Sequence, residues 1–166
     1  MHHLVWLPHH PGPYASVLVP AGQVLRVGRH SDNDIRLHSP SVSRFHVNVV
    51  SDGTVVRVRD RMSCCGFSIN GVRAEPEAVL RPGDELRVGS RELWLERLPA
   101  VEASWLAWAD GAVPRLARSA REDLRLLPLL ADALEDAGCV SADWLGRLRE
   151  PGDRVGWGVA QLGQGR

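Results

Sequence analysis

Short apolar stretches divided by turn residues fill the chain from Leu4 to Arg97, and several of them alternate with a period of two residues. Alternation of this kind puts every second side chain on one face of a β-strand, so that one face can be buried. The side chains expected on buried faces are Leu25 and Val27, then Phe45, Val47 and Val49, then Val56 and Val58, then Leu86 and Val88, then Leu93 and Leu95. Many short strands with one buried face each predict a mainly β fold, a β-sandwich of antiparallel or mixed sheets.

Turn residues between these stretches predict short connections between strands. Asn70-Gly71 is a strong hairpin signal, because both residues accept the positive φ angles that a two-residue turn needs. Asp52-Gly53 and Pro82-Gly83-Asp84 are further turn signals. The alternation and the turns together predict one β domain over residues 1–98.

The pattern changes after Pro99, where alanine and leucine become frequent. Residues 119–122 have the form of a capping box, a serine followed by a glutamate three positions later, which predicts the start of a helix. Trp105 and Trp108 lie three residues apart, so both are expected on one face of a helix that begins near Val101. We therefore predict a small α-helical extension over residues 99–166.

Two further helices are expected in this extension, at about residues 129–137 and 142–149, the second beginning at Ser141. The segments 129–139 and 144–149 are similar to a short helical tail found at the ends of some bacterial proteins. This similarity supports a domain boundary and implies no function.

Composition excludes several classes of function. The 20 basic and 20 acidic residues cancel, so the overall charge predicts no nucleic-acid partner and no membrane partner. Every basic residue other than histidine is arginine, which removes any mechanism that needs a lysine. Three cysteines are too few for a disulfide framework, and no apolar stretch is long enough for a membrane span. We expect a cytoplasmic protein.

Two short motifs place phosphate-binding chemistry near the ends of the predicted strands. Gly28-Arg29 ends one apolar strand, and Ser43-Arg44-Phe45-His46 precedes another. The planar guanidinium of arginine donates two hydrogen bonds at once to phosphate oxygens, and a serine hydroxyl supplies one more. The spacing of these motifs therefore predicts a phosphate-binding site on neighbouring loops.

The chain resembles the forkhead-associated (FHA) family of phosphothreonine-binding domains in six ordered blocks. The blocks are residues 24–29, 33–37 and 42–46, Asp60 with Ser63 and Gly66, residues 69–71, and residues 80–89. The resemblance implies a β-sandwich whose loops at one end bind a phosphothreonine-containing protein or peptide in signal transduction.

The resemblance also implies the roles of individual residues. Arg29 would hold the phosphate, Ser43 would donate its hydroxyl to a phosphate oxygen, and Arg44 would add a contact. The segment with Cys64 and Cys65 would lie against the bound peptide. The residues expected to support the site from within the structure are Gly28, His46, Asn70 and Gly71.

The chain departs from the family where the peptide main chain would be bound. Family members usually carry Ser-x-Asn-Gly-Thr there, and this chain has Ser63-Cys64-Cys65-Gly66-Phe67. Cys65 stands in the place of the asparagine, and a thiol donates and accepts hydrogen bonds less well than an amide. An alternative function is therefore a phosphate-independent interaction or scaffold domain with a degenerate pocket.

Enzymatic activity is not expected, and neither is a cofactor. Ser43 and His46 resemble half of a hydrolytic pair, but no glycine-flanked nucleophile elbow surrounds the serine. The pairs His2-His3 and His9-His10 lack the neighbouring carboxylates or cysteines of a usual metal site, so we expect exposed histidines and no metal.

Overall fold

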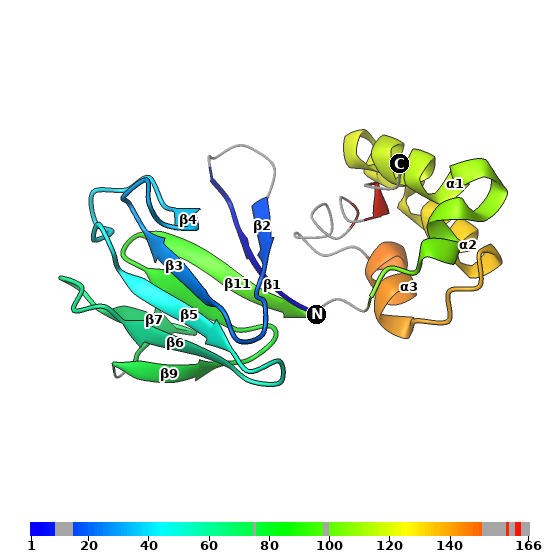
Figure 1. Ribbon diagram of the computed structural model, residues 1–166. Helices are drawn as coiled ribbons and strands as arrows, with labels where there is room; N and C mark the ends of the chain where they lie inside the picture. The colour runs from blue at the N-terminus through cyan, green and yellow to red at the C-terminus, as the bar shows by residue number, and fades with distance from the viewer. Residues whose placement is uncertain (9–14, 75, 98–99, 151–158, 160–161, 164–166) are drawn as a thin grey trace. The chain divides into compact units, whose positions relative to one another are not determined.

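The computed structural model describes residues 1–8, 15–74, 76–97, 100–150, 159 and 162–163, and it divides into two compact units, Met1–Arg97 and Leu98–Arg166 (Figure 1). The first unit consists of strands and the second of helices. Each unit has its own buried apolar side chains.

Two sheets pack face to face in the first unit. The larger has the strand order β2-β1-β11-β10-β7-β8, with β1 at His2–Trp6, β2 at Ala15–Leu18, β7 at Phe67–Ile69, β8 at Val72–Arg73, β10 at Glu85–Val88 and β11 at Arg91–Arg97. The smaller has the order β4-β3-β5-β6-β9, with β3 at Val24–Gly28, β4 at Ile35–Arg36, β5 at Val47–Ser51, β6 at Val56–Asp60 and β9 at Glu77–Leu80. Between described strands the pairing is antiparallel except for β3 with β4. The predicted β-sandwich is confirmed.

The alternating apolar residues form the core between the sheets. Every residue expected on a buried face is buried, with the exception of Phe45. The ring of Phe45 is 37% exposed because β5 begins only at Val47 and the buried position before it is taken by His46. Burial of a Val or Leu side chain contributes about 1.5 to 3 kcal/mol, so the two-residue periodicity accounts for most of the apolar stabilisation of this unit.

Asn70 and Gly71 form the predicted hairpin turn between β7 and β8, with φ angles of 51° and 79°. Both angles are positive, as a two-residue hairpin turn of this kind requires. The Asn70 side chain also donates to Asp84 Oδ1 at 2.8 Å and accepts from the Glu85 N–H at 2.9 Å. The turn is therefore tied to the connection between β9 and β10.

The prediction of exposed histidines is wrong for His3. Its ring is only 8% exposed, and it lies opposite the equally buried Glu96 in the pairing of β1 with β11. Burial, followed by the nearby charges of the N-terminus and His2, lowers the pKa of the His3 imidazole. His9 and His10 lie outside the described residues.

The second unit contains three α-helices and one short 3-10 helix among its described residues: α1 at Ala103–Glu122, η1 at Leu124–Leu126, α2 at Leu127–Asp136 and α3 at Ala142–Arg149. The two predicted later helices are confirmed. α2 begins two residues earlier than expected, because Pro128 is tolerated in its first turn. Ser141 caps α3 by accepting a hydrogen bond from the Trp144 N–H. No described helix has the length and hydropathy required to cross a bilayer.

Two predictions about the earlier helix are wrong. Ser119 does not begin a helix but lies in the last turns of α1, and the carboxylate of Asp123 caps the helix that follows. Trp105 is buried in the first turn of α1, but the backbone leaves the helical conformation at Trp108. Positive φ angles from there to Gly111 kink the helix, so the two tryptophans do not share a continuous helical face.

Candidate functional site

Three loops emerge at the same end of the β-sandwich. Val27 near the end of β3 lies opposite Val47 at the start of β5, and Val47 lies opposite Asp60 at the end of β6. The loop after β3 (residues 29–34), the loop before β5 (41–46) and the loop after β6 (61–66) are therefore neighbours. We name them the first, second and third loops. Arg29, Ser43, Arg44, Cys64 and Cys65 all lie on them.

Gly28 lets the first and second loops approach each other closely. The Arg29 N–H donates to the Ser43 carbonyl at 3.0 Å, and the His30 N–H donates to the Arg44 carbonyl at 3.1 Å. A Cβ atom on Gly28 would lie 2.3 Å from the Arg44 carbonyl oxygen, well inside van der Waals contact. Only glycine therefore allows this pair of backbone hydrogen bonds at the observed separation.

Asn33 is a buried support of the site that the sequence analysis did not single out. Its Nδ2 donates to the His30 carbonyl at 2.9 Å and to the Arg44 carbonyl at 2.7 Å. These two bonds join the first loop to the second from within the structure. In the sequence Asn33 is one polar residue in a run of polar turn residues, and the only signal was its place in a block that resembles the FHA family.

His46 joins the second loop to the third. Its ring is fully buried, and Nδ1 accepts a hydrogen bond from the Ser43 N–H at 2.9 Å. Nε2 therefore carries the proton of the neutral ring and donates to the Gly66 carbonyl at 2.8 Å. Because the ring is bonded to the Ser43 backbone and not to its hydroxyl, this geometry does not form a hydrolytic Ser–His pair.

The third loop holds the Ser43 hydroxyl in place. The Cys64 N–H donates to Ser43 Oγ at 3.1 Å, which leaves the hydroxyl proton available for a ligand. Asp60 accepts hydrogen bonds from both the N–H and the hydroxyl of Ser63, and Ser63 Oγ in turn accepts from the Gly66 N–H. These side-chain bonds shape the turn that presents Cys64.

The guanidinium groups of Arg29 and Arg44 are available to a ligand. Both side chains are exposed, and within the described residues neither guanidinium has a hydrogen bond or ion pair. Two arginines and one serine hydroxyl thus lie on adjacent loops. This set of donors fits a phosphate dianion.

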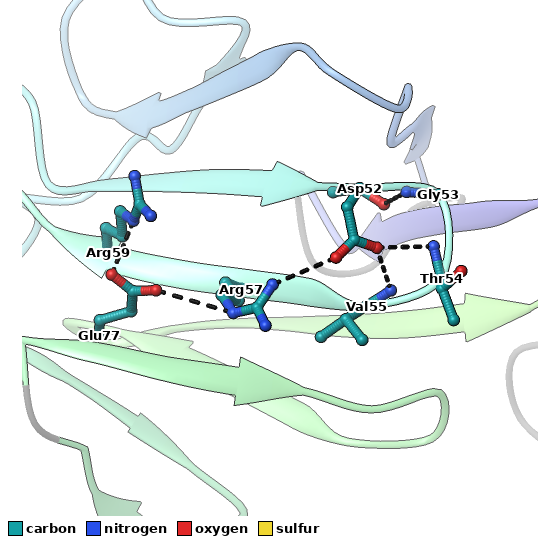
Figure 2. Close-up of polar contacts among 8 residues, drawn as sticks. Asp52, Gly53, Thr54, Val55, Arg57, Arg59 and Glu77 are labelled. Carbon is teal, nitrogen blue, oxygen red and sulfur yellow. Dashed lines mark hydrogen bonds and ion pairs between the residues drawn. The ribbon is translucent and has the colours of Figure 1, made fainter.

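Arginines on the outer face of the five-stranded sheet are, in contrast, neutralised by carboxylates. Figure 2 shows Arg57 between Asp52 and Glu77, at 3.4 Å and 3.8 Å, and Arg59 at 2.8 Å from Glu77. Hydrogen bonds from the Val55 and Thr54 N–H groups and from Arg57 lower the pKa of Asp52. The charges on this face cancel, so uncompensated positive charge collects at the loops.

Phe45 lies between two positively chargeable side chains beside the candidate site. The ring of His30 is 5.2 Å from its ring centre, and the Arg61 guanidinium is 5.7 Å from it. Contacts of a cation with an aromatic face hold the Arg61 side chain near the surface of the ring. Phe45 therefore links the first and third loops on the exposed side.

The remaining predicted residues do not all lie together. Cys64 and Cys65 carry exposed free thiols on the third loop. Asn70 and Gly71 lie at the other end of β7 from Gly66, where they contact the β9–β10 connection. The prediction that these two residues support the site is therefore corrected, since their contacts stabilise the opposite end of the sandwich.

Comparisons with known proteins converge on one family. Residues 25–89 match the family model of the FHA domain. The transcriptional regulatory protein EmbR of Mycobacterium tuberculosis is 37% identical over 67 residues, which is 40% of this chain and 17% of EmbR. The chain covers only 5 to 17% of the length of the curated relatives that it matches.

Solved structures show the same fold with bound partners. The FhaA FHA domain complexed with the intracellular domain of Rv3910 has a TM-score of 0.52 and 27% identity, over 58% of this chain and all of that domain. M. tuberculosis EmbR in complex with a low affinity phosphopeptide has a TM-score of 0.50 and 25% identity, over 61% of this chain and 26% of EmbR. An FHA domain from a structural and functional analysis of phosphothreonine-dependent interactions has a TM-score of 0.52 and 27% identity, over 60% of this chain and all of that one.

Proposed function

We propose that this chain, which carries an FHA domain, binds phosphothreonine-containing segments of a partner protein as a non-enzymatic signalling or scaffold protein of the cytoplasm. The observation that carries the proposal is the pair of unpaired guanidinium groups, Arg29 and Arg44, beside the available hydroxyl proton of Ser43. The similar FHA structures, one with a phosphopeptide and one from a study of phosphothreonine-dependent interactions, support the same conclusion.

The mechanism follows from preorganised donors. Backbone hydrogen bonds and the side chains of Asn33 and His46 hold the three loops in place before a ligand arrives. Addition of a phosphate to the partner then creates new charge-assisted hydrogen bonds to Arg29, Ser43 and Arg44. Little ordering of the protein is needed, so most of this interaction energy contributes to affinity.

Cys65 favours one alternative, an interaction domain that does not require phosphate. Its exposed thiol offers the peptide main chain a weaker partner than the amide usual at that position. The deciding experiment is titration calorimetry of the whole chain with matched phosphorylated and unphosphorylated threonine peptides. Binding of the phosphorylated form alone is expected, and equal binding of both forms would favour the alternative.

Binding should weaken on acidification and in salt. A phosphate monoester loses its second negative charge below about pH 6, whereas the arginines stay charged, so affinity should fall severalfold from about pH 7.5 to pH 5. Added salt should weaken binding as well, because it screens exposed charges. Fluorescence anisotropy across a pH series and a salt series checks both trends, and an affinity indifferent to both contradicts a phosphate-dependent complex.

Cys65→Asn should strengthen binding. The amide can add one or two hydrogen bonds to the peptide main chain, each contributing about 0.5 to 1.5 kcal/mol, which corresponds to a severalfold to tenfold gain in affinity. Cys65→Ala serves as the control, because it removes the thiol without supplying an amide. If Cys65→Asn binds phosphopeptides more weakly than the original chain, the peptide main chain does not pass this position as proposed.

A further inference from the structure

A polar hollow of about 360 Å³ lies next to the third loop. It is lined by Asp60, Gly66, Phe67, Arg73, Ala74 and Pro76. Arg73 comes from β8, which returns from the hairpin turn toward the candidate site: Arg73 lies opposite Ser68, and the Ala74 N–H donates to the Phe67 carbonyl at 3.0 Å. The hollow is therefore continuous with the loop that presents Cys64 and Cys65.

The Arg73 guanidinium lies over Gly66. A Cβ atom placed on Gly66 would be 3.2 Å from one terminal nitrogen of Arg73. Within the described residues this guanidinium has no hydrogen bond and no ion pair, and the side chain is exposed. Arg73 thus shares with Arg29 and Arg44 the property of an uncompensated charge at the loop end of the sandwich.

Asp60 is the acidic group that could have neutralised Arg73, since it lines the same hollow. Both of its carboxylate oxygens instead accept hydrogen bonds from Ser63, and it forms no ion pair with Arg73. Its charge reduces the local positive potential but does not occupy the guanidinium. An anionic ligand can therefore bind the donors of Arg73 directly.

The distance from the phosphate position to Arg73 is short along the loop. Cys64 contacts Ser43 Oγ, and Gly66, on which Arg73 lies, is two residues further on. An extended chain advances about 3.3 Å per residue, so a peptide with its phosphate at Ser43 would bring a residue two or three positions away to Arg73.

We propose that Arg73 is a specificity-determining residue, which selects partner segments with a second anionic group two or three positions from the phosphothreonine. The inference rests on the proposed function and deepens it. The second group is either the carboxylate of Asp or Glu or a second phosphate, because both present oxygen pairs to a guanidinium fork.

The test measures the affinity of the whole chain for phosphothreonine peptides in which each flanking position carries Gln, Glu or phosphoserine in turn. At one position two or three residues from the phosphothreonine, Glu or phosphoserine should bind about three- to tenfold more tightly than Gln, as expected for one exposed charge-assisted contact. Arg73→Gln should abolish that preference and leave binding of the Gln peptide nearly unchanged. A preference for phosphoserine over Glu would identify a doubly phosphorylated segment, and equal gains would identify any acidic one.

Arg81→Gln is the matched control, since Arg81 lies in the β9–β10 connection at the other end of the sandwich and its guanidinium likewise has no ion pair in the described structure. It should keep the preference for an acidic flanking residue. If all flanking residues bind equally, or if Arg73→Gln retains the preference, the role of Arg73 is refuted while the proposed function stands. If the unphosphorylated peptides bind as well as the phosphorylated ones, the proposed function itself fails.

Discussion

The Arg29→Ala variant is expected to bind a phosphothreonine peptide about a hundredfold more weakly than the original chain, with its thermal stability nearly unchanged. The substitution removes two charge-assisted hydrogen bonds of about 1.5 to 3 kcal/mol each, and a loss of about 3 kcal/mol corresponds to a hundredfold in affinity. Stability should be retained because the structural bonds of Arg29 involve its backbone: its N–H donates to Ser43, and its carbonyl accepts from Arg36. Calorimetry and thermal unfolding of the same samples measure both quantities.

Arg81→Ala is the control for this prediction. It removes another arginine without an ion pair in the described residues, but at the end of the sandwich away from the three loops. Its affinity for the phosphopeptide should stay within about twofold of the original, since a distant exposed charge is screened. An Arg29→Ala variant that binds as well as Arg81→Ala would contradict the placement of the phosphate.

Local patterns predicted the architecture well because they report which side chains face a core. The two-residue alternation of Val56 with Val58 and of Leu93 with Leu95 corresponds to buried faces of strands. Asn70-Gly71 forms its turn through backbone preferences of those two residues alone. Ser141 is likewise a local signal, since a cap depends on a residue three positions away.

Local patterns failed where contacts distant in sequence decided the outcome. Phe45 continues the alternation of β5, but the strand ends before it because His46 is held by Ser43 and Gly66. Residues 119–122 form a capping box by spacing alone, yet the helix already runs through them from Ala103. Competing tertiary contacts override such short signals.

The candidate site shows the same division. Arg29 and Ser43 could be singled out from residue type and family resemblance, whereas Asn33 and Arg73 could not. Asn33 matters because of a carbonyl eleven residues away, and Arg73 because a hairpin returns it to Gly66. Neither relationship leaves a pattern in the nearby sequence.

Gly28→Ala is expected to have the largest effect among substitutions that remove no charge. The new methyl group would lie 2.3 Å from the Arg44 carbonyl oxygen and 3.0 Å from Asn33 Nδ2. Both neighbours are fixed, the first because it is backbone and the second because it already donates to that carbonyl. The first and second loops must then move apart, at a cost of about 1 to 3 kcal/mol in folding free energy. Phosphopeptide binding should be lost as well, because Arg29 and Ser43 would no longer face a common ligand.

Gly146→Ala supplies the control for adding a methyl group. Gly146 lies in α3, its φ is not in the left-handed region, and nothing lies within 4 Å of the added Cβ position. Alanine there should stabilise the helix by about 0.5 to 1 kcal/mol and leave phosphopeptide affinity unchanged. Thermal unfolding and anisotropy of the two variants separate the expected outcomes. If Gly28→Ala unfolds at the original temperature and binds the phosphopeptide normally, then close backbone packing of the two loops is not what aligns Arg29 with Ser43, and the preorganised site proposed for this chain is wrong.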